Sequence, residues 1–132
     1  MATAERRPAR ARPVYLDLFR IRMPLPSIIS ILHRVSGALL LVAGVPVLLW
    51  GVERSLASPE AYAALRATLA HPLWKLVLLG LAWAFLHHVC AGVRHLFLDA
   101  HIGIELAAAR RSSVIVFVVS LALTLVVAAK LW

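Results

Sequence analysis

The sequence has one cysteine and few acidic residues, and these shortages exclude several kinds of site. Cys90 has no second cysteine to pair with, so the chain cannot form an internal disulfide. No CxxCH motif is present for covalent haem attachment, and there is no glycine-rich phosphate loop or Ser/His/Asp spacing. Only 6 Asp and Glu stand against 14 Lys and Arg. The sequence therefore shows no disulfide framework, no nucleotide-binding segment and no hydrolase triad.

What the sequence has in abundance is apolar residues in long runs. Hydrophobic residues make up 62% of the 132 positions, and the mean hydropathy is +0.88. About 20 helical residues cross a hydrocarbon core of about 30 Å, and each of three runs is long enough to do so. The sequence predicts an all-α membrane protein with three transmembrane helices, at about residues 29–52, 73–98 and 112–132.

Two parts of the chain follow from this reading. Residues 1–26 form a proline-containing polar arm, and residues 27–132 form the transmembrane anchor domain. Ser27 is the expected N-cap of the first helix. In the first connection, Ser58 and Pro59 begin a further helical pattern, which predicts a short interfacial helix between the first two spans.

The positive charges predict the orientation of the spans. Most Lys and Arg residues lie in the N-terminal arm and the second connection, which places the N-terminus in the cytoplasm and the C-terminus outside. We expect the arm to be retained rather than cleaved as a signal peptide, since a long polar arm leads into a full-length span. Topogenic charge and contact with lipid headgroups explain its basic character, so no nucleic-acid partner is expected.

The second span carries ionisable residues, which are costly inside a membrane and point to function. His88 and His95 are seven positions apart, on one helix face, with Gly92 between them and His87 about 100° away. Because glycine lacks a side chain, a flat ligand or another helix can approach this face closely.

The first span carries a second polar group near its cytoplasmic start. Ser30, Arg34 and Gly37 share one face, with His33 on an adjoining stripe, and a hydroxyl beside a cation suits an anionic or carbonyl-bearing ligand. The topology brings this group to the same half of the membrane as His88. A tetrapyrrole fits that order, with its iron on the deeper imidazole and its propionates near Arg34, His33 or Arg94.

Simpler interpretations remain open for these residues. A histidine in a helix can be hydrogen-bonded to a neighbour, and an arginine near a helix end can extend to the headgroups. The Ser30 hydroxyl can bond to its own helix backbone. Asp99 and Glu105 can be solvated loop charges, paired with Arg110 or Arg111.

Two segments, residues 12–37 and 88–99, carry a family resemblance. The first contains S-x-x-H-R-x-S beginning at Ser30, and the second contains H-x-x-x-G-x-R-H beginning at His88. Together they resemble the cytochrome b556 subunits of succinate dehydrogenase, the membrane anchors of respiratory complex II. The resemblance extends over nearly the whole chain, although Leu98 stands where the family often has an aromatic residue or methionine.

This resemblance implies the roles of particular residues. His88 matches the axial iron ligand of haem b, with the opposite ligand supplied by a histidine of a companion membrane anchor. His33 and Arg34 match residues near the haem propionates, while Ser30 and Arg34 match residues of the ubiquinone pocket. Asp99 and Glu105 fall where the family has acidic residues associated with proton delivery. His95 and His87 receive no ligand role.

The resemblance also implies partners and a location. The chain would anchor a flavoprotein subunit and an iron-sulfur subunit to a bacterial-type inner membrane, as a subunit of succinate dehydrogenase (quinone) without a flavin or dicarboxylate site of its own. Its share of the electron transport would be to hold haem b and to form part of the site that reduces ubiquinone. Two alternatives stay open: an anchor of a fumarate reductase or other quinone-linked cytochrome b, and a haemless transporter or scaffold subunit whose histidines relay protons.

Overall fold

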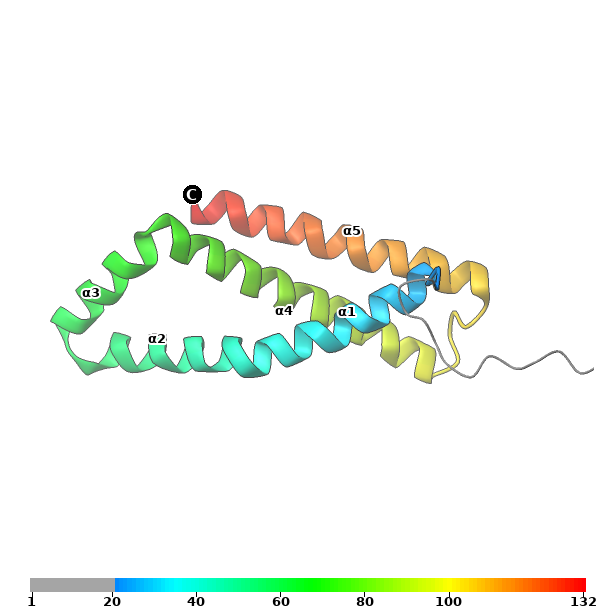
Figure 1. Cartoon of the computed structure of the whole chain (residues 1–132), viewed down its shortest axis with the longest axis horizontal. Coiled ribbons are helices and arrows are strands. Elements are labelled where there is room, and N and C mark those ends of the chain that lie inside the picture. Colours follow the sequence, from blue (N-terminus) through cyan, green and yellow to red (C-terminus); the bar gives the residue numbers. More distant parts are fainter. Residues whose placement is uncertain (1–20) are drawn as a thin grey trace, which may run out of the picture.

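The computed structural model describes residues 21–132, and helices form all of the regular structure in that part of the chain. Figure 1 shows them as a long, narrow bundle in which the start of α1, the end of α4 and the start of α5 lie at one end. The elements are α1 (Leu25–Leu39), the π-helical turn η1 (Leu40–Gly44), α2 (Val45–Ala57), α3 (Pro59–Ala70), α4 (Pro72–Asp99) and α5 (Leu106–Leu131).

Three helical stretches are long and apolar enough to span a membrane, which confirms the predicted fold class. They are Leu25–Ala57, Pro72–Asp99 and Leu106–Leu131. Most of their large apolar side chains are exposed on the bundle surface. In water such a surface would be unfavourable, whereas lipid tails solvate it as well as a protein interior does. The chain is therefore a multi-pass membrane protein.

The first helix begins earlier than the sequence predicted. Its N-cap is Pro24, whose carbonyl oxygen accepts hydrogen bonds from the backbone N–H groups of Ser27 and Ile28, at 3.0 and 3.3 Å. The prediction that Ser27 caps this helix is wrong, because Pro26 fits inside the first turn. The N–H that proline lacks has no partner within the helix at that position anyway.

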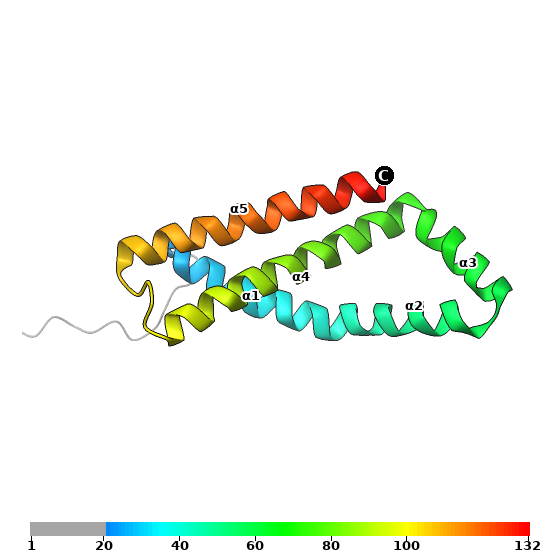
Figure 2. The ribbon, with the colours of Figure 1, turned by 180° about the vertical axis from the view of Figure 1, so that it is seen from behind.

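A π-helical turn then changes the course of the first span. Pro46 is the second residue after η1. It cannot donate a backbone hydrogen bond, and its ring would crowd the carbonyl four residues earlier. Widening the preceding turn relieves that conflict. As a result, α1 packs against α4, while α2 diverges from α4 and is joined to its far end by α3 (Figures 1 and 2).

The connecting helix α3 begins as the sequence predicted. The Ser58 hydroxyl accepts a hydrogen bond from the backbone N–H of Ala61 at 3.2 Å. A hydrogen bond from the same hydroxyl is the main cause of a lowered pKa of Glu60. The interfacial position of α3 stays a prediction. His71 caps the next helix, since its Nδ1 accepts a hydrogen bond from the backbone N–H of Leu73 at 3.3 Å.

Helix α4 ends in a hydrogen-bonded turn whose left-handed residue is not a glycine. The N–H of Ile102 bonds to the carbonyl of Phe97, and the N–H of His101 bonds to that of Leu98, each at 2.9 Å. These two hydrogen bonds form a Schellman motif, which requires a residue in the left-handed conformation after the helix. His101 occupies that place with φ of 61°. The chain then turns back into α5.

Small and polar residues predominate among the buried residues of α4 and α5. The buried residues of α4 are Ala84, His87, Ala91 and Arg94, and those of α5 are Ser113, Val116 and Ser120. Small side chains allow the two backbones to approach closely, which is how membrane helices associate.

The hydrogen bonds of Arg94 connect α4 to α5 at the loop end of the bundle. Arg94 Nε donates to Ser112 Oγ at 2.9 Å, and Nη2 donates to the Ala109 carbonyl oxygen at 3.4 Å. We expect Ser112→Ala to lower the free energy of unfolding by about 1 to 2 kcal/mol, because it removes a hydrogen bond to a buried cation. Titration of the detergent-solubilised protein with SDS, followed by circular dichroism, measures this change.

Ser113→Ala is the matched control for that substitution. The Ser113 hydroxyl donates only within its own helix, to the Ala109 carbonyl oxygen at 2.7 Å. Such a bond adds little to a carbonyl that the helix already satisfies, so its removal is expected to change the free energy of unfolding by no more than about 0.5 kcal/mol. Equal losses in the two variants would contradict a stabilising link from Arg94.

Candidate functional site

The His88 imidazole points from α4 toward α1 and is held at one nitrogen. Its Nδ1 lies 3.0 Å from the carbonyl oxygen of His33 and 3.3 Å from Ser36 Oγ. The Ser36 hydroxyl itself donates to that same carbonyl, at 2.9 Å. Because a carbonyl oxygen can only accept, the geometry places the ring proton on Nδ1. His88 Nε2 is then the nitrogen with a free lone pair.

At two places between α1 and α4, a glycine of one helix faces a histidine of the other. A Cβ built at Gly37 would lie 2.7 Å from His88 Cε1, closer than any unstrained contact. A Cβ built at Gly92 would lie 3.5 Å from His33 Nε2, an ordinary van der Waals distance. The space at Gly37 is therefore required by the His88 ring, whereas the space beside Gly92 is filled by the His33 side chain of α1.

Three histidine rings form a column between α1 and α4. The rings of His33 and His88 stack with centroids 4.2 Å apart and planes inclined by 15°. On its other side, the His33 ring lies 5.0 Å from that of His95, at 45°. The His33 and His88 rings therefore lie at the same level of the bundle. Stacked faces do not direct two nitrogens at one metal ion, so this arrangement does not favour His33 as a second iron ligand.

The Ser30 and Arg34 pair lies next to this histidine column on α1. Ser30 is half-buried and Arg34 is exposed. Within residues 21–132 no hydrogen bond is formed by the Ser30 hydroxyl, in contrast to the Ser36 hydroxyl, which bonds to its own helix backbone. Both polar groups are thus accessible to a ligand that approaches this end of α1.

Arg94 belongs to a different part of the structure. Its guanidinium turns toward α5, where it bonds to Ser112 and to the Ala109 carbonyl oxygen. It is only 7% exposed, because its side chain is enclosed between α4 and α5. Of the three side chains considered for an anionic edge of a tetrapyrrole, only His33 and Arg34 lie on α1.

The two acidic residues lie on either side of the turn between α4 and α5. Asp99 is the last residue of α4, and Glu105 is the residue before α5; both are exposed. In the described part of the chain, no ion pair joins either carboxylate to Arg110 or Arg111. The charge of Glu105 is favourable at a helix N-terminus, which gives it a structural role besides any function.

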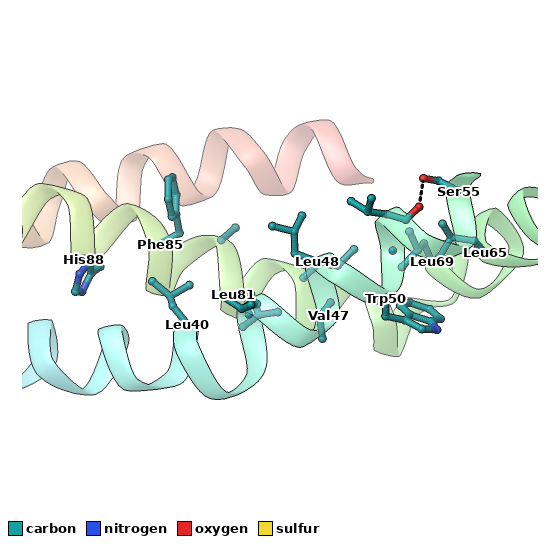
Figure 3. A pocket seen from close by; sticks show the side chains of 16 residues that line it. Leu40, Val47, Leu48, Trp50, Ser55, Leu65, Leu69, Leu81, Phe85 and His88 are labelled. Atoms are coloured by element: carbon teal, nitrogen blue, oxygen red, sulfur yellow. Dashed lines mark hydrogen bonds between the residues drawn. The ribbon is translucent and has the colours of Figure 1, made fainter. Parts of the chain in front are cut away.

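A deep apolar groove extends from His88 toward the far end of the bundle. It has a volume of about 800 Å³ and is lined by side chains from η1, α2, α3 and α4. Figure 3 shows His88 at one end of the groove, with Leu40 and Phe85 nearby and Trp50 farther along. An imidazole that lines an apolar space of this size fits the needs of a haem, whose iron takes a nitrogen ligand and whose ring is flat and apolar.

Sequence reasoning missed two features of this region. Ser36 was recognised only as part of a motif, whereas the structure places its hydroxyl against the His88 ring. His87 is fully buried, with its ring 5.4 Å from that of Trp83, and within the described residues neither ring nitrogen has a hydrogen-bond partner. The only sign of this packing in the sequence was the spacing of Ser30, Arg34 and Gly37, which places a glycine on the face of α1 that α4 approaches closely.

Comparisons with known proteins agree with the resemblance seen in the sequence. A family model described as succinate dehydrogenase/fumarate reductase transmembrane subunit matches residues 8–127. A succinate dehydrogenase cytochrome b556 subunit of Paracoccus denitrificans is 38% identical over 102 residues, covering 77% of this chain and 78% of the relative. The corresponding subunit of Coxiella burnetii is 35% identical over 122 residues, covering 92% and 97%. That of Rickettsia felis is 30% identical over 114 residues, covering 86% and 88%.

Proposed function

Because this chain belongs to the succinate dehydrogenase/fumarate reductase transmembrane subunit family, we propose that it holds haem b through His88 and forms part of a ubiquinone-reduction site. The relatives are named as cytochrome b556 subunits of succinate dehydrogenase, which favours succinate oxidation over fumarate reduction as the activity of the whole complex. The chain is a membrane anchor of the cytochrome b type. The bond from His88 Nδ1 to the His33 carbonyl oxygen is the observation that carries the haem assignment.

Histidines that bind metals almost always donate their second ring nitrogen to a carbonyl or carboxylate. That bond fixes the tautomer and orients the ring, so that the other nitrogen can bind the iron. In His88 the Ser36 hydroxyl and the His33 carbonyl oxygen surround Nδ1, which leaves Nε2 for the metal. When bound, haem b supplies one-electron redox chemistry. The second axial ligand is assigned to a companion anchor subunit.

Ser30 and Arg34 are assigned to the quinone. The guanidinium is a permanent cation with several N–H donors, and the hydroxyl is a smaller donor one helical turn away. Together they can bind a quinone carbonyl oxygen and stabilise the negative charge that develops on it during reduction. Arg34 and His33 are also assigned to the haem propionates. Asp99 and Glu105 are assigned to proton delivery from the cytoplasmic side.

The partners in this proposal are a flavoprotein subunit, an iron-sulfur subunit and the companion anchor. The flavoprotein oxidises succinate, and the iron-sulfur subunit passes the electrons to the membrane. The present chain then contributes binding and positioning groups rather than a dicarboxylate site. Its N-terminus is assigned to the cytoplasmic side of a bacterial-type respiratory membrane, in keeping with its many arginines.

Arg34→Leu tests the quinone assignment in the assembled complex. Loss of a charged hydrogen-bond donor is expected to lower succinate-dependent ubiquinone reduction about 10- to 100-fold. Reduction of a water-soluble dye, which accepts electrons before they reach this chain, is expected to be unchanged. Arg54→Leu, at an exposed position near the end of α2, is the control and should leave both rates unchanged. Normal quinone reduction by the Arg34→Leu complex would contradict the assignment.

A further inference from the structure

A second groove lies between the end of α4 and the start of α5, beside the loop that connects them. It has a volume of about 640 Å³ and does not include His88, Ser30 or Arg34. Near the loop its lining is charged and comes from Arg94 and Arg111, together with Glu105. It is thus separate from the histidine column and opens at the end of the bundle where headgroups would lie.

One of these charges is buried without a compensating anion. Arg94 is 7% exposed, and both of its hydrogen-bond partners, Ser112 Oγ and the Ala109 carbonyl oxygen, are neutral. Within residues 21–132 no carboxylate pairs with it. A buried cation is costly unless an opposite charge or strong hydrogen bonds accompany it. Because Arg111 lines the same groove, the two cations exceed the single acidic residue, and the groove favours an anion.

The other part of the groove is apolar. Val93 of α4 and Ile115 of α5 line it on the side away from the loop, and each is at least 48% exposed at the bundle surface. A free inorganic anion would gain nothing from such a surface. A molecule with an anionic head and an apolar tail would match both parts of the groove.

We infer that this groove binds an anionic phospholipid, with the phosphate held by Arg94 and Arg111 and an acyl chain lying along Val93 and Ile115. Basic pockets between transmembrane helices at the cytoplasmic side are suited to anionic headgroups. The proposal goes beyond the haem and quinone function and requires neither group to be bound. It also gives Arg94 the counter-charge that the described part of the chain does not supply.

The test uses the assembled complex, freed of lipid in neutral detergent and titrated with phosphatidylglycerol against a background of phosphatidylcholine. Native mass spectrometry counts the bound lipid. Arg111→Gln is expected to raise the half-saturating amount of phosphatidylglycerol about fivefold. Arg110→Gln removes the same charge from the neighbouring position, which is exposed and does not line the groove. It is expected to change that amount by less than about twofold.

A second variant and a second anion separate a lipid site from a simple anion site. Ile115→Trp fills the apolar part of the groove at a position that is 60% exposed, and it is expected to weaken lipid binding as well. Inorganic phosphate should not displace the bound lipid. The inference is overturned by equal effects of the two arginine variants, by displacement with phosphate, or by the absence of any preference for phosphatidylglycerol. The haem spectrum serves as a separate readout and should be unchanged in all three variants.

Discussion

Replacing His88 with alanine is expected to remove the b-type α-band from the reduced-minus-oxidised spectrum of the assembled complex. Alanine offers no ligand to the iron, and no other imidazole can replace it, because the His33 ring stacks on His88 rather than pointing along the same axis. A covalent thioether link would retain the haem without its ligand, but the chain has no CxxCH motif. Visible spectroscopy and haem extraction from the purified complex measure the loss, which we expect to be nearly complete.

His95→Phe is the matched control for the His88 substitution. His95 lies on the same face of α4, and its ring contacts His33 from the other side of the column. A phenyl ring preserves that contact while removing both nitrogens. The α-band should therefore persist in this variant. A complex that keeps its band without His88 and loses it without His95 would show that the iron ligand has been assigned to the wrong histidine.

The second large effect is expected from Gly37→Ala. The added methyl group would lie 2.7 Å from His88 Cε1, so the ring must move. Any movement also weakens the bond between Nδ1 and the His33 carbonyl oxygen, which is 3.0 Å long. Loss of such an orienting contact typically weakens metal binding about 10- to 100-fold, and a similar loss of haem retention is expected here. The measurement is the haem content of the purified complex at a fixed protein concentration.

Gly92→Ala makes the same chemical change on the opposite helix. There the new methyl group meets His33 Nε2 at 3.5 Å, which is an ordinary contact. Alanine is also the better residue for a helix interior. Haem content close to that of the wild type is therefore expected. If the two glycine variants lost haem equally, the close fit between Gly37 and His88 would not be what positions the ligand.

The architecture could be predicted from the sequence because the three hydrophobic runs dominate it. Long runs are read reliably, since a membrane requires all backbone polar groups to be bonded internally and helices meet that need. Details at the helix ends were less accessible. Ser27 is a favourable N-cap residue, but Pro26 is equally acceptable as the second residue of a helix. The helix therefore begins two residues before Ser27, and Pro24 is its N-cap. The Schellman turn could not be predicted, because a histidine, His101, occupies the left-handed position at which glycine is usual.

The periodicity of the sequence placed several polar residues on shared helix faces, but it did not give their arrangement in space. Periodicity placed His88, Gly92 and His95 on one face, and the rings of both histidines do lie beside the α1 residue His33. The stacking of the His33 ring on His88 could not be predicted, because the crossing of α1 and α4 depends on where small residues allow the helices to approach closely. The sequence also could not show that the Arg94 side chain points toward α5, since this depends on a hydrogen bond to a serine 18 positions away.

The most direct test of the central claim uses the unmodified complex, isolated from membranes through a tag on this chain. The predicted result is a preparation that contains the flavoprotein and iron-sulfur subunits, oxidises succinate with ubiquinone as acceptor, and shows a b-type α-band in its dithionite-reduced minus oxidised spectrum. An intact, active complex without that band would contradict the assignment of His88 as a haem ligand. A preparation in which this chain is isolated without those subunits would contradict its role as their anchor.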